Sequence, residues 1–235
     1  MRFFNVMFLS MISVAFAAQI WHGPRDVAKV ALTFDDGPRP EQADKILDIL
    51  DQYGVRATFF VVGESMRLYP DLGYRIVTQG HELANHSDTH VRLDRLPVSG
   101  IRNEFQRSNR AIYRVTGRPV PYFRPPGGRI NDRVIDVAER LGMQAVMWDV
   151  NAGDFTHAGD TMMIQGESSS KRQVYYQSAA AMTREVLAKI QPGSIVLFHN
   201  GGEQTITALP GIIEAIKAKG LEMVMVSELM GRAWP

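Results

Sequence analysis

The sequence contains no cysteine among its 235 residues. This absence excludes thiol nucleophiles, iron–sulfur clusters, cysteine-based zinc sites and disulfides. A chain of this length buries enough surface on folding to do without a disulfide. Any transition metal that the protein binds must therefore be held by histidine and carboxylate side chains.

An excess of charge of either sign is also lacking. The chain has 26 Lys and Arg residues against 25 Asp and Glu residues, which gives a net charge of +1. The basic residues are spread along the sequence, and we find no RNA- or DNA-binding motif. We therefore expect no nucleic-acid partner and no binding to polyanions. The hydrophobic fraction of 45% and the charged fraction of 22% are those of an ordinary globular protein.

The first residues differ from the rest of the chain. Met1-Arg2 gives a positive start, residues 3–16 are almost entirely apolar or small, and Ala15-Phe16-Ala17 fits the small-x-small rule for signal-peptide cleavage. The stretch is short for a transmembrane helix. The alternative to a cleaved signal peptide is an uncleaved N-terminal anchor. The sequence thus predicts a signal peptide at residues 1–17 and a mature chain of residues 18–235. It predicts a secreted or periplasmic protein with no membrane span after cleavage.

Strand-like and helix-like segments alternate through the mature chain. Short apolar runs predict strands at residues 29–34, 57–62, 82–84, 121–123, 145–150, 194–198 and 222–226. Apolar residues at helical spacing predict helices at residues 41–53, 68–78, 99–116, 132–141, 179–190 and 208–219. About seven strand–helix units, with no linker or repeat between them, indicate a single α/β domain with a parallel inner sheet, like a barrel.

Polar side chains that can carry chemistry follow these predicted strands directly. They are Asp35 and Asp36, His86 and His90, Arg124, Asn151 and Asp154, and His199. In a barrel, the carboxyl ends of the strands form one rim, and active sites are built there. We therefore expect these side chains to meet in space.

Two of these groups predict a metal site. His86-Ser87-Asp88-Thr89-His90 places two imidazoles four residues apart, within reach of one ion, although such a pair alone is also typical of a solvated loop. Asp36 can supply an oxygen ligand and leave positions open for water and substrate. Asp35-Asp36-Gly37-Pro38 is by itself also a good turn sequence. In a site, one carboxylate binds the ion and the other acts as a general base.

His199 and the stretch Arg124-Pro125-Pro126-Gly127-Gly128 supply the remaining chemistry. A lone histidine at the end of an apolar strand is often structural, but on this rim a protonated imidazole can give its proton to a departing amine. Arg124 can pair with Asp35. The backbone N–H of Gly127 can stabilise a tetrahedral oxyanion, although the stretch alone is typical of a tight loop.

On these motifs the chain resembles the NodB-homology family of polysaccharide deacetylases, carbohydrate esterase family 4, from about residue 29 to residue 229. The matching segments are Thr33 to Pro38, His86 to His90, Arg124 to Gly128 and Leu197 to His199. The resemblance implies a deformed (β/α)7 barrel and a divalent ion, usually zinc and sometimes cobalt or nickel. It also implies roles for individual residues: Asp35 as catalytic base, Asp36, His86 and His90 as metal ligands, His199 as general acid, and Arg124, Gly127 and Leu197 as further site residues.

The chain departs from the family pattern in two motifs. Gly127 stands where an aromatic residue is usual, so any stacking of that ring on a sugar is lost. The motif D-x-x-D-W is replaced by Asn151-Ala152-Gly153-Asp154-Phe155. We interpret the first position of this motif as the partner of the catalytic histidine, so Asn151 predicts a lower pKa for His199 than in relatives. Asp149, on the same face of the predicted strand, is the candidate for a replacement charge, and Asp154 is assigned to the substrate side.

The resulting prediction is a metal-dependent hydrolase that removes N-acetyl groups from an acetylated amino-sugar polysaccharide: peptidoglycan, chitin oligomers or poly-N-acetylglucosamine. The alternatives are an O-acetyl (xylan) esterase and a non-catalytic carbohydrate-binding relative. The polar segment 156–177 predicts either a loop over the cleft, with Tyr175 and Tyr176 stacking on sugars, or a surface loop. The sequence does not indicate the oligomeric state.

Overall fold

One parallel sheet organises the molecule, a computed structural model that describes residues 19–154 and 178–233. Its strands are β1 (Gln19–Ile20), β2 (Lys29–Gly37), β3 (Thr58–Val61), β4 (Glu82–Asn85), β5 (Tyr122–Phe123), β6 (Gln144–Val146), β7 (Val150–Asn151), β8 (Ile195–His199) and β9 (Glu222–Val224). They lie in the order β1-β6-β5-β4-β3-β2-β8-β7, and β9 also pairs with β2. Residues 147–149 connect β6 to β7, which lie near opposite ends of this order. The sheet therefore curls into the deformed α/β barrel that the sequence predicted.

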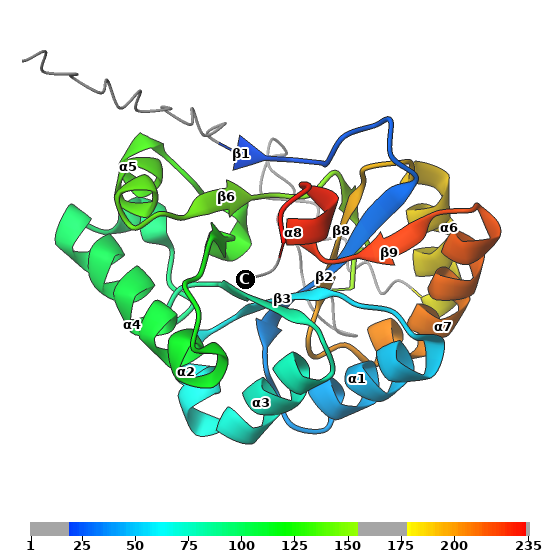
Figure 1. Ribbon diagram of the computed structural model, residues 1–235, viewed down its shortest axis with the longest axis horizontal. Coiled ribbons are helices and arrows are strands. Elements are labelled where there is room, and N and C mark those ends of the chain that lie inside the picture. Colours follow the sequence, from blue (N-terminus) through cyan, green and yellow to red (C-terminus); the bar gives the residue numbers. More distant parts are fainter. Residues whose placement is uncertain (1–18, 155–177, 234–235) are drawn as a thin grey trace, which may run out of the picture.

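Helices surround the sheet: most cover its outside, and the last one lies over the middle of the ring in this view (Figure 1). They are α1 (Gln42–Tyr53), α2 (Gly63–Leu68), α3 (Pro70–Thr78), α4 (Val98–Thr116), α5 (Asp132–Arg140), α6 (Ala179–Lys189), α7 (Glu203–Ala218) and α8 (Val226–Leu229), with short 3₁₀ turns at Leu93–Arg95 and Pro126–Gly128. Among the described residues, no helix has both the length and the apolar character that crossing a bilayer requires.

Strand β2 shows how side-chain alternation divides the core into two layers. Leu32 and Phe34 belong to the cluster between the sheet and the helices, and Phe34 stacks on Phe198 with ring centroids 5.4 Å apart. Ala31 belongs to the cluster inside the barrel. Because successive side chains of a strand point to opposite faces, Asp35 also points into the barrel. The apolar pattern of β2 thus directs this carboxylate into the interior at the rim.

The predicted elements match the structure with local differences. The predicted strand 145–150 splits into β6 and β7, because the chain changes strand neighbours between them. The predicted helix 68–78 corresponds to α3, which begins at Pro70 because a residue before proline, here Tyr69, disfavours helical backbone angles. Helix α7 begins at Glu203 rather than at residue 208. The short elements β1, α2 and α8 were not predicted.

Candidate active site

Strand register brings the rim residues together. In the pairing of β2 with β8, Asp35 lies directly opposite His199, and the backbone N–H of Asn200 donates to the carbonyl of Asp35 at 2.8 Å. A hollow of about 320 Å³ opens at this end of the barrel. It is lined by Asp35, Asp36, His86, His90, Gly127, Gly128, Trp148, Asn151, Leu197 and His199. Residues far apart in the sequence therefore form one site, as predicted.

Arg124 and Asp35 form a buried ion pair beneath the hollow. Both side chains are almost completely buried, and Nη1 of Arg124 lies 2.7 Å from Oδ1 of Asp35. Other guanidinium N–H groups donate to Thr33 Oγ1 and to the backbone carbonyls of Val146 and Met147 at 2.9–3.0 Å. The guanidinium also lies over the ring of Phe60, 4.1 Å from its centroid. This network fixes the orientation of the Asp35 carboxylate, as the sequence analysis expected from the pair.

Asp36, His86 and His90 bring three ligand atoms to one point. Oδ1 of Asp36 lies 3.3 Å from Nε2 of His86 and 3.0 Å from Nε2 of His90. The three atoms all lie within 4.8 Å of one another, a spacing that can hold one metal ion. Burial opposes the ionisation of Asp36, but hydrogen bonds from the two histidines outweigh it and lower the pKa of Asp36. The hydrogen bond to Asp36 raises the pKa of His90.

A hydrogen bond at Nδ1 of His86 orients the ring so that Nε2 can act as a metal ligand. Nδ1 donates to the carbonyl oxygen of Arg124 at 2.8 Å, so Nε2, which faces Asp36, is the ring nitrogen that can bind a metal ion in place of its proton. The backbone near the ligands is unusual, because Asp36, Ser87 and His90 have φ angles of 71°, 64° and 57°. Non-glycine residues rarely adopt such angles, and strained positions cluster at functional sites.

Asp88 holds the loop between the two histidines, a role that the sequence analysis did not assign. Its side chain is completely buried, and it forms ion pairs with Arg67 of α2 and Arg107 of α4. Glu104 of α4 accepts hydrogen bonds from the backbone N–H groups of Asp88 and Thr89, both at 2.9 Å. The ligand loop is thus tied to two outer helices.

The carboxylate partner of His199 is Asp154. Nδ1 of His199 donates to Oδ1 of Asp154 at 2.8 Å, while Oδ2 accepts from the backbone N–H of His199 at 2.7 Å and from Thr205 Oγ1 at 2.6 Å. Burial disfavours the charged imidazole, but the hydrogen bond and the charge of Asp154, together with the charges of Asp35 and Asp36, outweigh burial and raise the pKa of His199 to about 9. The imidazole therefore carries a proton at neutral pH.

This geometry corrects the interpretation of Asn151 and Asp149. Asn151 lines the hollow, but its Oδ1 accepts from the backbone N–H of Gly153 at 2.8 Å, and the carboxylate bonded to the ring of His199 is that of Asp154. Asp149 is bound by Arg25 at 2.8 Å and by the backbone N–H of Ile195 at 2.8 Å, and it precedes β7. Ile195 lies four residues before His199 on β8, about 13 Å along a strand. Asp149 therefore does not replace a missing charge, and Asp154 supplies that charge.

Three more groups line the hollow. Leu197 is buried in β8, and Gly127, with a φ of 63°, follows Pro126 in the arginine loop. Trp148, which the sequence analysis did not single out, lies against Gly128, where an added Cβ would come within 2.8 Å of the indole. An aromatic ring thus borders the hollow although Gly127 offers none. The segment 156–177, with Tyr175 and Tyr176, lies outside the described residues.

Comparisons with known proteins agree with this geometry. Residues 22–146 match the family model for polysaccharide deacetylases. The chain is 31% identical over 215 residues to a peptidoglycan-N-acetylglucosamine deacetylase of Bacillus cereus, a match that covers 89% of this chain and 92% of that protein. It is 34% identical over 215 residues to a chitooligosaccharide deacetylase of Bradyrhizobium sp., with 85% of this chain and 90% of that protein covered.

A solved structure shows that this fold alone does not decide catalysis. The chain superposes with a TM-score of 0.79 on a CE4 family pseudoenzyme from Bacillus anthracis, at 30% identity and with 91% of this chain and 69% of that chain covered. Activity has to be argued from the groups in the site, because one fold can host different functions.

Proposed function

Because the chain belongs to the polysaccharide deacetylase family, we propose that it is a metal-dependent hydrolase that removes N-acetyl groups from an N-acetylglucosamine-type polysaccharide. One observation carries this proposal. Three ligand atoms converge within 4.8 Å of one another, and Asp35 and His199 line the same hollow. A metal site with a carboxylate and a protonated imidazole beside it is suited to amide hydrolysis.

The donor set fits a divalent ion. Two imidazole nitrogens and one carboxylate oxygen are ligands that zinc accepts, and cobalt or nickel can use the same atoms. The hydrogen bond from His86 Nδ1 to the carbonyl of Arg124 orients Nε2 as a ligand atom. When bound, such an ion polarises the acetyl carbonyl and lowers the pKa of a water molecule. Asp36, His86 and His90 would hold it.

Two other residues of the hollow each carry out one of the two proton transfers that hydrolysis requires. Arg124 binds Oδ1 of Asp35, and Oδ2 lies 3.8 Å from Nε2 of His86, beside the place for the ion. Asp35 accepts a proton from the attacking water. His199, protonated and oriented by Asp154, donates a proton to the leaving nitrogen as the carbon–nitrogen bond breaks. The N–H of Gly127 can donate to the oxyanion of the tetrahedral intermediate.

The names of the relatives support an acetylated amino-sugar substrate, peptidoglycan or a chitin oligomer, and with it a place in the cell envelope or outside the cell. Export would require the predicted signal peptide at residues 1–17, and cleavage there would leave residues 18–235 as the catalytic domain. Sequencing the N-terminus of the protein recovered from the cell envelope tests this part. An N-terminus at residue 18 supports it, and an intact Met1 contradicts it.

Acetate release tests the activity. The protein is incubated with chitopentaose, with purified peptidoglycan and with acetylated xylan, each with chelator and with added zinc. Chelator-sensitive release from chitopentaose or peptidoglycan is the expected result. Release from xylan alone would indicate an O-acetyl esterase. Binding of chitopentaose without acetate release would indicate a non-catalytic relative.

A further inference from the structure

Arginine side chains gather on the outward face of α4, outside the lining of the rim hollow. Arg107, Arg110 and Arg114 are exposed and recur at intervals of three and four residues, so they share one side of the helix. They span about 10 Å along the helix axis. Arg118, also exposed, follows two residues after the helix ends. Helix α4 lies at the outer edge of the molecule (Figure 1).

Two hollows lie along this face. One, of about 540 Å³, is lined by Arg110, Arg114 and Arg118, by Asn109 and Tyr113, and by a floor of mainly apolar residues that includes Pro119, Val120 and Leu141. The other, of about 120 Å³, is lined by Arg67, Arg107, Arg110, Ala111 and Arg114. Arg110 and Arg114 line both, so the hollows adjoin. Neither lining includes a carboxylate.

Three of these arginines, Arg110, Arg114 and Arg118, form no ion pair with a described residue. Asp88 pairs with Arg67 and Arg107 from the buried side, and Glu104 is occupied by backbone N–H groups. In residues 19–154 and 178–233, no carboxylate lies within ion-pair distance of Arg110, Arg114 or Arg118. Guanidinium groups bind carboxylates and phosphates in a bidentate manner, so these three arginines are suited to an anionic ligand.

Exposed tyrosines accompany the arginines. Tyr113 on α4 is 57% exposed and Tyr74 on α3 is 48% exposed, and the hydroxyl of Tyr74 donates to the backbone carbonyl of Arg114 at 3.3 Å. A tyrosine ring offers an apolar face with a polar tip, which suits the C–H face and the hydroxyl groups of a sugar. Concave hollows also suit a polymer strand better than a lipid surface, to which proteins present protruding apolar side chains.

We propose that this face, formed by Arg107, Arg110, Tyr113, Arg114 and Arg118, is a second binding site whose ligand is an anionic glycan, a sugar polymer that carries carboxylate or phosphate groups. The near-neutral charge of the whole chain predicted no polyanion partner, but that total does not record that the fold places these arginines on one helix face. The lining of this site shares no residue with the rim hollow. Arg107 also pairs with Asp88 of the ligand loop, so the test below changes Arg110 and Arg114 instead.

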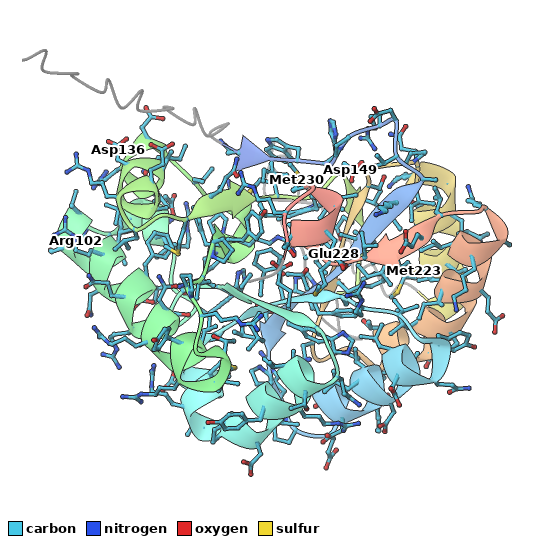
Figure 2. The ribbon with its side chains drawn as sticks, in the orientation of Figure 1. Arg102, Asp136, Asp149, Met223, Glu228 and Met230 are labelled. Carbon is cyan, nitrogen blue, oxygen red and sulfur yellow. The ribbon has the colours of Figure 1, made fainter. Side chains whose placement is uncertain are left out.

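Binding of a labelled polygalacturonate oligomer, followed by fluorescence anisotropy, tests the proposal. This probe carries a carboxylate on each sugar, and its methyl-esterified form supplies the uncharged comparison. The variant Arg110→Glu/Arg114→Glu removes the shared centre of both hollows. The variant Arg102→Glu/Arg184→Glu changes the net charge equally at exposed arginines near the N-terminal end of α4 and on α6. Figure 2 labels Arg102 at the edge of the molecule. Unfolding midpoints verify that both variants fold.

We expect the wild-type protein and the Arg102/Arg184 variant to bind the charged oligomer alike, with affinity that falls as salt is added. The Arg110/Arg114 variant should bind it about ten-fold more weakly or worse, and the esterified oligomer should not bind. Equal loss in both variants, or equal binding of the esterified oligomer, would overturn the proposal. Binding to anionic phospholipid vesicles or to RNA in place of the glycan would overturn it too, and would assign the face to that partner. Acetate release does not enter this test, so the two proposals fail separately.

Discussion

The carboxylate of Asp154 contacts His199 twice, through Oδ1 to the ring Nδ1 at 2.8 Å and through Oδ2 to the backbone N–H at 2.7 Å. The ring and the backbone of the same residue are thus fixed by one side chain. Thr205 Oγ1 donates to Oδ2 as well, at 2.6 Å, which orients the carboxylate in turn. The imidazole is held in one orientation and kept charged by the same group.

Replacing Asp154 tests this relationship. A general acid must be protonated, so activity falls as the pH rises through the pKa of His199, which is raised to about 9 with Asp154 as the main contributor. In Asp154→Asn the charge is lost, and the alkaline limb of the kcat/KM profile should move to lower pH by about one unit or more.

The variant Asn151→Asp is the matched control. The Asn151 side chain accepts a hydrogen bond from the backbone of Gly153, and the ring of His199 is bonded to Asp154. A charge added at position 151 should therefore move the alkaline limb much less. A limb that moves with Asn151→Asp and stays in place with Asp154→Asn would contradict the assignment of the partner.

The rim residues could be predicted from the sequence because parallel strands end at a shared edge. Asp35 and His199 are 164 positions apart, yet β2 and β8 place them opposite each other. The partner of His199 could not be predicted in this way. After Asn151 the chain leaves the strand and turns at Gly153, where φ is 73°, so the alternation of strand side chains no longer applies. This turn brings Asp154 back beside His199 at the end of β8.

The arginine face on α4 escaped prediction for a related reason. Total charge does not record where charges lie, and the arginines at 107, 110 and 114 share a side only once the segment is helical. The role of Asp88 depends on α2 and α4 packing beside the ligand loop, a tertiary contact that spacing does not encode.

Asp88→Asn should weaken metal binding although Asp88 is not among the three converging ligands. The change leaves Arg67 and Arg107 without their buried anion and loosens the loop that carries His86 and His90. Mutating a group that orients metal ligands typically lowers metal affinity about 10–100-fold. Calorimetric titration with zinc should show a loss of affinity of this size.

The control for Asp88 is Asp94→Asn, which breaks the exposed pair with Arg92 outside the ligand loop. Arg107→Gln removes one of the two arginine partners and should give an intermediate loss. Equal zinc affinity in Asp88→Asn and Asp94→Asn would show that Asp88 has no positioning role.

Trp148→Ala should raise KM for a chito-oligomer more than it lowers kcat. The indole borders the hollow beside Gly128 and is the aromatic side chain that lines the described part of the site. Removing it takes away apolar contact with a sugar ring but leaves Asp35, His199 and the three ligands in place. Trp148→Phe should restore most of the affinity, and Trp21→Ala, at a 50% exposed position outside the hollow, should have no effect. A fall in kcat at unchanged KM would instead indicate that Trp148 acts by supporting Arg124, whose guanidinium lies 5.5 Å from its ring centroid.

Zinc should stabilise the wild-type protein against heat, and His90→Ala should abolish this effect. A ligand that binds the folded state alone adds about 2.7 kcal/mol at a free concentration one hundred times its Kd, and chelator removes that gain. His90 is the ligand to replace, because its side chain is 46% exposed whereas that of His86 is 2% exposed, so its loss disturbs the core least. His22→Ala, at an exposed histidine outside the site, should retain the full zinc-dependent shift in Tm. Because the readout is thermal unfolding, it tests the ligands independently of turnover. An undiminished zinc shift in His90→Ala would place the ion elsewhere and remove the basis for Asp36, His86 and His90 as its ligands.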